Sequence, residues 1–476
     1  MQKTYPIKKY LLKKTLNVTC NDTYDTTNYS DINVNVPKDS ILKKFLTERG
    51  NADSIFSYYT ATNIDKILFF DDTENITSTN KMFEYSNLTS VPLFNTHKVT
   101  SMNEMFYECR NLKSIPLFDT SCVTSMEKTF AVCDILTEIP LLDTSSVQNM
   151  QGTFFMCSKL RTIPLLNTSK VTNMKELFNY CTNLISIPKL DTSNVINSVG
   201  MFSGCTSLTE VPLLDLSNAT HTSNMFYNCT SLTSIPLLDT SKAEDIRGMF
   251  SGCSSLTEIP ALNTSNVQNI SSLVEGCKLL TTIPQLDTSN VTDMSNMFGG
   301  CTSLTEVPAL DTSKVTSAKG MFSGCANLTE IPDTMNFPKV TNISDMFYGC
   351  SKLYKTPPIN MTNVNPSFGA TNAFLGCTSL TYLYLTNIKT SLSFPVSSKL
   401  TQNTLFNLCK ECVNTGSRCT ITLHRTPKNT LNGMYVVMSG TSIPKGQKGT
   451  VSLASSGTSG AILITEYLKR KNWYIN

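Results

Sequence analysis

The sequence predicts a repeat solenoid, in which one short unit coils again and again around a continuous apolar core. Ten cysteines recur at a step of 24 residues, without insertion or deletion. A proline and a phenylalanine recur at fixed places beside them. Such self-similarity indicates a solenoid, because each unit buries its apolar side only against its neighbours. The ten cysteines are Cys109, Cys133, Cys157, Cys181, Cys205, Cys229, Cys253, Cys277, Cys301 and Cys325.

Composition excludes several classes of function. Of the 476 residues, 40% are hydrophobic and 16% are charged, so the chain can build a core but carries little charge. A net charge of +3 without a basic stripe argues against a nucleic-acid partner. No apolar run approaches the ~20 residues of a membrane span. The first fourteen residues lack the apolar stretch of a secretion signal, so we expect any exit from a cell to use another route.

The first half of each unit is expected to form a strand and a turn. Counting Leu208 as position 0, Val211 is position 3, Pro212 position 4, Leu214 position 6 and Asp215 position 7. The Leu-x-x-Ile/Val segment predicts a very short β-strand that ends at the proline, which has no N–H to donate. The following Asp-Thr-Ser predicts a turn. Stacked from unit to unit, these turn residues should form a ladder.

The second half of each unit reads Val-x-x-Met-x-x-Met-Phe, with an apolar residue at every third place. This spacing suits a second short strand or a 3₁₀-like turn. The sequence therefore predicts a right-handed coil of short β-strands joined by 3₁₀ or short helical turns. Its phenylalanines form a column with one gap, at Val274. The step widens to 25 residues at Cys350 and to 27 at Cys377, where we expect insertions to bulge outward.

Three regions are expected along the chain. Residues 1–63 lack the repeat and are predicted to form an N-terminal cap or attachment module, with strands at 15–20 and 32–37 and a short helix over 39–50. Residues 64–380 should form the solenoid of about 13 units. Residues 381–476 are predicted to form a small C-terminal α+β module.

Within the C-terminal module, the segment that follows Thr401 predicts an amphipathic helix with Thr401 as its N-cap. Residues 419–424 alternate as a strand does, and further strands, with a helical turn, are expected between residue 449 and the end.

The unit C-T-S-L-T-E-V/I-P-x-L-D-T-S-N-V-T-x-M-x-x-M-F-x-G resembles the leucine-rich repeats of the BspA type found in surface proteins of gut Bacteroidetes and in mycoplasma lipoproteins. The resemblance covers about two-thirds of the chain. It implies a leucine-rich-repeat solenoid and adhesion at a cell surface, with no enzyme and no cofactor. The C-terminal module is similar to one that follows such repeats in proteins of gut bacteria and their phages.

The cysteines raise two chemical possibilities. Column cysteines of neighbouring units would lie close to disulfide distance. Each would have a neighbour on both sides and point alongside it, so buried, packed thiols are the favoured interpretation. Cys409, Cys412, Cys419 and His424 could form a zinc site, but cysteines on one helix face more often belong to a core. We expect no metal, cofactor or catalytic residue.

Binding residues are expected where exposed side chains recur or break the repeat. Glutamates share position 2, beside the predicted strand, where they could line a sugar- or cation-binding face or form a solvated surface. Two other polar residues replace an apolar residue at position 5. The candidates are Glu138, Glu210, Glu258, Glu306 and Glu330 at position 2, with Lys189 and Gln285 at position 5.

These observations predict a non-enzymatic recognition, adhesion or structural protein. The missing secretion signal and the C-terminal resemblance favour a phage virion component, an accessory or receptor-binding protein that contacts a gut-bacterial surface. Its expected partners are a protein or glycan on that surface, or other virion proteins. The alternatives are a bacterial cell-surface adhesin, and a catalytic or metal-binding C-terminal module on a repeat stalk. The oligomeric state is left open.

Overall fold

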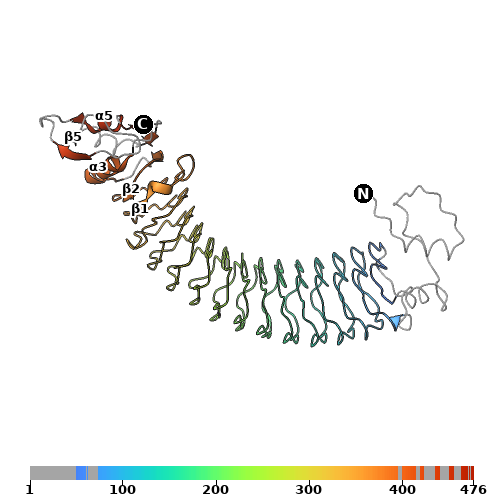
Figure 1. Ribbon diagram of the computed structural model, residues 1–476. Helices are drawn as coiled ribbons and strands as arrows, with labels where there is room; N and C mark the ends of the chain where they lie inside the picture. Colours follow the sequence, from blue (N-terminus) through green and yellow to red (C-terminus); the bar gives the residue numbers. More distant parts are fainter. Residues whose placement is uncertain are drawn as a thin grey trace, which may run out of the picture. The chain divides into compact units, whose positions relative to one another are not determined.

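The structure is a computed structural model (Figure 1). The expected N-terminal strands, and nearly all of the expected helix after them, lie outside the residues that it describes. The chain divides into two compact units, Met1–Ala219 and Thr220–Asn476. The structure describes residues 50–60, 62, 73–394, 399–413, 419–422, 435–439, 450–454, 462–469, 471 and 473–475.

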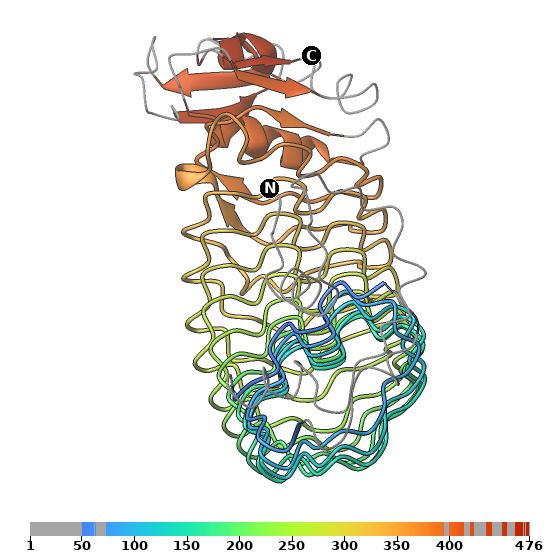
Figure 2. The ribbon, with the colours of Figure 1, turned by 90° about the vertical axis from the view of Figure 1, so that its right-hand side faces the viewer.

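Stacked coils of near-identical path make up the first unit from residue 73 onward, as the blue to blue-green turns of Figure 2 show. Neighbouring coils pair in parallel at one residue each, which is position 13 of the unit. Where this residue is asparagine, its side chain also caps the next turn, as when Asn173 Oδ1 accepts from the Lys175 N–H at 3.1 Å. The bridges of this unit are Ser78↔Ser101, Ser101↔Ser125, Ser125↔Asn149, Asn149↔Asn173 and Asn173↔Asn197.

The parallel pairing does not lie where the sequence predicts it. In the described coils between residues 73 and 358, the Leu-x-x-Ile/Val segments form no regular strand. They make single bonds between coils, such as Lys113 N–H to Thr89 O at 2.9 Å and Ile185 N–H to Arg161 O at 3.0 Å. The proline that follows has no N–H, so a longer ladder cannot form there. The solenoid prediction is confirmed, but its strand assignment to this segment is wrong.

The Met-x-x-Met-Phe half forms the expected 3₁₀-like turns. Met105 N–H bonds to Met102 O at 3.1 Å, and Cys109 N–H bonds to Phe106 O at 3.0 Å. Alternate N–H groups point to the next coil, as Phe106 does to Thr129 O at 2.8 Å. This alternation needs left-handed backbone at two places per coil. Glu104 adopts it with φ +55°, and several later coils use glycine there instead, because glycine has no Cβ to clash.

The phenylalanine column runs through the core of both units. In the first unit, Phe130, Phe154 and Phe178 are buried and stack nearly parallel, with centroid distances of 5.7 and 5.6 Å. In the second unit, Phe298 and Phe322 stack at 5.4 Å, while the buried Val274 fills the gap in the column.

The expected turn ladder is present. The Asp143 carboxylate accepts from the Ser145 N–H at 2.9 Å, which holds the turn within one coil. The buried Thr120 hydroxyl then donates to Asp143 O of the next coil at 2.7 Å. Thr264 repeats this bond to Asp287 O at 2.7 Å in the second unit. The ladder gives these backbone carbonyls a hydrogen-bond partner in the neighbouring coil.

In the second unit, parallel stacking continues past residue 380. Strand β1 (Ile359–Asn360) pairs in parallel with β2 (Leu385–Thr386), and the 3₁₀ helix η2 (Met361–Asn363) follows β1. The rings of Phe374 and Phe394 stack at 5.5 Å, so the aromatic column also reaches beyond that point.

Within the described residues of this unit, two small sheets and two helices follow (Figure 1). The strands β3 (Leu392–Ser393), β4 (Cys419–Thr422) and β8 (Trp473–Ile475) pair in parallel in the order β3-β4-β8. The antiparallel sheet has the order β6-β5-β7, with β5 at Tyr435–Ser439, β6 at Thr450–Ala454 and β7 at Ile462–Leu463. The helices are α3 (Gln402–Glu411) and α5 (Ile464–Lys469).

Both ends of helix α3 are capped by side chains. Thr401 is the N-cap, as predicted, and its hydroxyl accepts from the Thr404 N–H at 3.2 Å. At the other end, the fully buried Lys471 donates to Cys412 O at 2.5 Å and to Lys410 O at 3.2 Å. A cation at this end also complements the helix dipole.

Candidate functional site

All seven candidate residues lie at the surface, on separate coils, so the structure does not bring them together as one cluster. Two of them contact a neighbouring coil. Gln285 Nε2 donates to Ala309 O at 2.9 Å, and Glu330 Oε2 accepts from the Tyr354 hydroxyl at 2.6 Å. The exposed residues are Glu138, Lys189, Glu210, Glu258, Gln285, Glu306 and Glu330.

Leucines at position 5 form an exposed stripe that the sequence reasoning missed. In four consecutive coils of the first unit, their exposed fractions run from 52% to 63%. The signal was present in the sequence, because in these coils the Pro is followed by two apolar residues, of which only the second is buried. We call positions 1, 2 and 5 the outer face. Its exposed leucines in these coils are Leu93, Leu117, Leu141 and Leu165.

At Glu330 the outer face carries a cluster of aromatic and charged side chains. Tyr354 donates to Glu330, and Lys355 forms an ion pair with Asp333 at 2.6 Å. Lys355 Nζ also lies 5.7 Å from the centroid of the Tyr384 ring. The hydrogen bond to Glu330 raises the pKa of Tyr354, and the one to Asp333 raises the pKa of Lys355. Tyr354 and Lys355 therefore both keep their protons near neutral pH.

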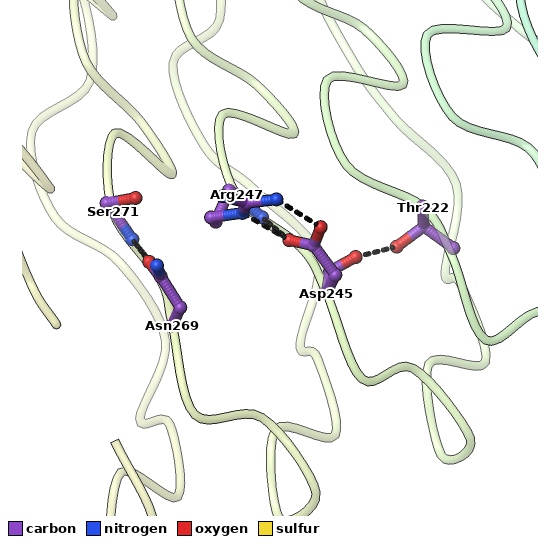
Figure 3. Close-up of polar contacts among 5 residues, drawn as sticks. All are labelled: Thr222, Asp245, Arg247, Asn269 and Ser271. Atoms are coloured by element: carbon purple, nitrogen blue, oxygen red, sulfur yellow. Dashed lines mark hydrogen bonds and ion pairs between the residues drawn. The ribbon is translucent and has the colours of Figure 1, made fainter. Parts of the chain in front are cut away.

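A second polar feature is an open hollow of about 750 Å³ that Arg247 and Asp245 help to line. Figure 3 shows these two side chains in contact with each other. Arg247 donates to both carboxylate oxygens of Asp245, at 2.9 and 2.8 Å. Burial acts to raise the pKa of Asp245, but the bonds from Arg247 outweigh it, and the pKa is lowered. Thr222 donates to the Asp245 carbonyl at 3.1 Å. Because the guanidinium and the carboxylate neutralise each other, this hollow offers little net charge to an ion.

The column cysteines occupy hydrogen-bonded core positions. Column thiols in both units donate to a carbonyl of the preceding coil, as Cys157 does to Phe130 O at 3.0 Å and Cys325 does to Phe298 O at 3.0 Å. Burial raises the pKa of Cys157 to about 12 and that of Cys277 to about 12. A protonated, buried thiol is a poor nucleophile and a poor metal ligand.

The proposed zinc ligands are only partly placed. Cys409 and Cys412 are buried, and burial raises the pKa of Cys409 to about 12. His424 and the side chain of Cys419 lie outside the described parts of the chain. Among the side chains that are described, no group of three or more histidine, cysteine, aspartate or glutamate residues could hold a metal ion.

Stacked coils with leucine, phenylalanine and cysteine columns define a leucine-rich-repeat solenoid. The chain belongs to the family described as Mycoplasma protein of unknown function, DUF285, whose model matches residues 51–165, 148–258 and 244–360. This confirms the resemblance to BspA-type surface-protein repeats. No curated protein matches the chain. No helix among the described residues is long and apolar enough to cross a membrane.

Solved structures of leucine-rich-repeat proteins are similar to the chain at low identity. One from Bacteroides ovatus ATCC 8483 is 17% identical over 75% of this chain and 82% of that one, with a TM-score of 0.41. A leucine-rich cell surface protein from Faecalibacterium prausnitzii A2-165 is 21% identical over 66% and 83%, with a TM-score of 0.35. A third, from Eubacterium ventriosum ATCC 27560, is 16% identical over 72% and 88%, with a TM-score of 0.32.

Proposed function

We propose that this protein is a non-enzymatic recognition protein that binds a protein or glycan on a bacterial surface through its outer face. Membership in a family of bacterial leucine-rich-repeat surface proteins suggests such recognition or adhesion. The observation that carries the proposal is the exposed leucine stripe. Apolar side chains that remain exposed on consecutive coils form a continuous patch, and such patches mark interaction sites.

Polar residues beside the stripe would supply specificity. Lys189 takes the place of leucine at position 5, so it interrupts the apolar stripe with a positive charge. The glutamates at position 2 add hydrogen-bond acceptors beside it. We propose that Glu138, Lys189 and Glu210 contact the partner beside the stripe in the first unit. Glu258, Gln285, Glu306 and Glu330 are proposed as contacts on the same face of the second unit.

The binding experiment uses the full chain and whole gut-bacterial cells. The double variant Leu117→Ser, Leu141→Ser removes the centre of the stripe and should weaken cell binding at least roughly tenfold, as loss of a central apolar anchor does. Ile196→Ser is the matched control, because Ile196 is 49% exposed but lies at position 12, away from the outer face. Equal binding by the double variant, or no binding by the native chain, would refute the proposal.

We further propose that the protein is carried on a phage virion and that the three regions 1–63, 64–380 and 381–476 act as attachment module, solenoid and C-terminal module. The similarity of the C-terminal module to modules of gut bacteria and their phages supports this placement. Mass spectrometry of purified virions should find the chain. Its presence in the surface fraction of bacterial cells, and absence from virions, would favour a bacterial adhesin instead.

A further inference from the structure

A hollow in the second unit has the chemistry of a ligand site. It lies beside the coil between Cys350 and Cys377, which is longer than the regular 24-residue step. It is open, measures about 610 Å³, and is lined by residues of neighbouring coils, with Asn342 and Lys389 on either side of the inserted segment 362–368. The volume lies within the range of small-molecule sites. The coil that contributes most of the lining is one of the two that break the 24-residue step, since Cys350 and Cys377 are 27 residues apart.

The inserted segment is locked onto the preceding coil. Asn365 N–H bonds to Thr341 O at 2.9 Å, and Ile343 N–H bonds to Gly369 O at 2.6 Å. A Cβ at Gly369 would lie 2.7 Å from Thr341 O, so the backbones approach too closely for any side chain there. The loop is therefore held in place before any ligand arrives.

This hydrogen-bonded loop exposes the side chain of Phe368 to solvent. This side chain is 57% exposed, although the residue lies inside the turn that the Gly369 N–H closes by donating to Asn365 O at 2.9 Å. The ring lines the hollow together with hydroxyl and amide side chains. A rigid, exposed aromatic ring beside polar groups is suited to stack against the C–H face of a sugar ring, because its position needs no reordering on binding.

The polar lining supplies mainly hydrogen-bond donors. The side-chain oxygens of Asn342 and Asn365 already accept from backbone N–H groups at 2.9 Å, while their amide nitrogens make no hydrogen bond within the described part of the chain. Lys389 adds a positive charge and donates to Thr362 O at 3.3 Å. The lining contains no carboxylate. Such a hollow favours a ligand rich in acceptor oxygens and bearing negative charge.

We propose that this hollow binds an acidic saccharide, a pyranose that stacks on Phe368 and directs its carboxylate and hydroxyl oxygens toward Lys389 and the two asparagine amides. The proposal rests on the surface-recognition function above and names a ligand class for a second site, which lies on the second unit. It is independent of the leucine stripe, which lies on other residues.

The test measures binding of the full chain to an oligogalacturonide by calorimetry, with the fully methyl-esterified oligomer as the uncharged comparison. Native protein should bind the acid form at least roughly tenfold more tightly than the ester, and Phe368→Ala should weaken binding at least roughly tenfold. Lys389→Met should remove most of the preference for the acid. Tyr348→Ala is the control, because Tyr348 is also an exposed aromatic residue, at 45%, but does not line the hollow.

The outcomes separate this proposal from the one on which it rests. No binding of the acid oligomer, equal binding of acid and ester, or unchanged binding by a Phe368→Ala variant of native melting temperature would overturn it. Cell binding that persists in Phe368→Ala but not in the leucine double variant, together with no saccharide binding, would overturn this site and leave the proposed function standing. Saccharide binding by the native chain without any cell binding would overturn the proposed function and leave this site standing.

Discussion

Raising the pH from 8 to 9.5 should destabilise this protein, because its core thiols resist ionisation while those of the unfolded chain do not. Burial raises the pKa of Cys157 from 9.0 to about 12. Cys277, Cys377 and Cys409 are raised to about 12 by the same cause. A thiol with a raised folded pKa contributes stability that is complete below the unfolded pKa near 9 and is lost as the pH climbs toward 12.

The magnitude follows from the two pKa values. At pH 9.5 an unfolded thiol is mostly ionised and the buried one is not, so each thiol lowers the free energy of unfolding by about 0.8 kcal/mol relative to pH 8. The four thiols together give a loss of roughly 3 kcal/mol. Other column thiols with a raised pKa, such as Cys133 and Cys253, add to this loss in the same direction. Stopping at pH 9.5 avoids most of the ionisation of tyrosine and lysine.

Urea unfolding at pH 8, 8.5, 9 and 9.5 measures this loss. Cys157→Ala should unfold more easily at every pH, because it leaves a small cavity, but its stability should fall less between pH 8 and 9.5, by about 0.8 kcal/mol. Exposed Cys122 offers the control: Cys122→Ala should have the native pH dependence. A native chain of constant stability across this range, or equal slopes for Cys157→Ala and the native chain, would refute the reasoning.

Three further substitutions test the parts of the fold. Phe154→Ala removes a buried ring that stacks on a neighbour on each side, and should lower the free energy of unfolding by about 3–5 kcal/mol in urea, whereas a loss near zero would mean that the column is not packed as described. Thr264→Val keeps the side-chain shape but removes the donor to the Asp287 carbonyl, and should lower the free energy of unfolding by about 1–3 kcal/mol in the same assay. Ser265→Ala, at the half-buried next residue, is the comparison variant. Lys471→Met leaves carbonyls at the end of helix α3 without a donor, and limited proteolysis should then cut the C-terminal residues faster than the coils, while equal rates would contradict this role.

The sequence alone determined the features that depend on local spacing. The 24-residue step defined the coil, since every unit must present the same side chains to its neighbours. It also placed the buried phenylalanine and cysteine columns, the turn ladder at Asp143 and Thr120, and the N-cap at Thr401, because each depends on residues close together or repeated at one step.

The tertiary structure decided what depends on direction and on distant partners. Two adjacent apolar residues follow the proline in most coils, and only the path of the coil shows that Leu117 faces water while Phe118 is buried. The parallel pairing lies at position 13 instead of the Leu-x-x-Ile/Val segment because proline removes a donor there. Lys471 reaches Cys412 from 59 residues away, and the loop that exposes Phe368 lies in a coil whose length departs from the repeat. Periodicity carries no information on such contacts, because they are made by residues that do not repeat.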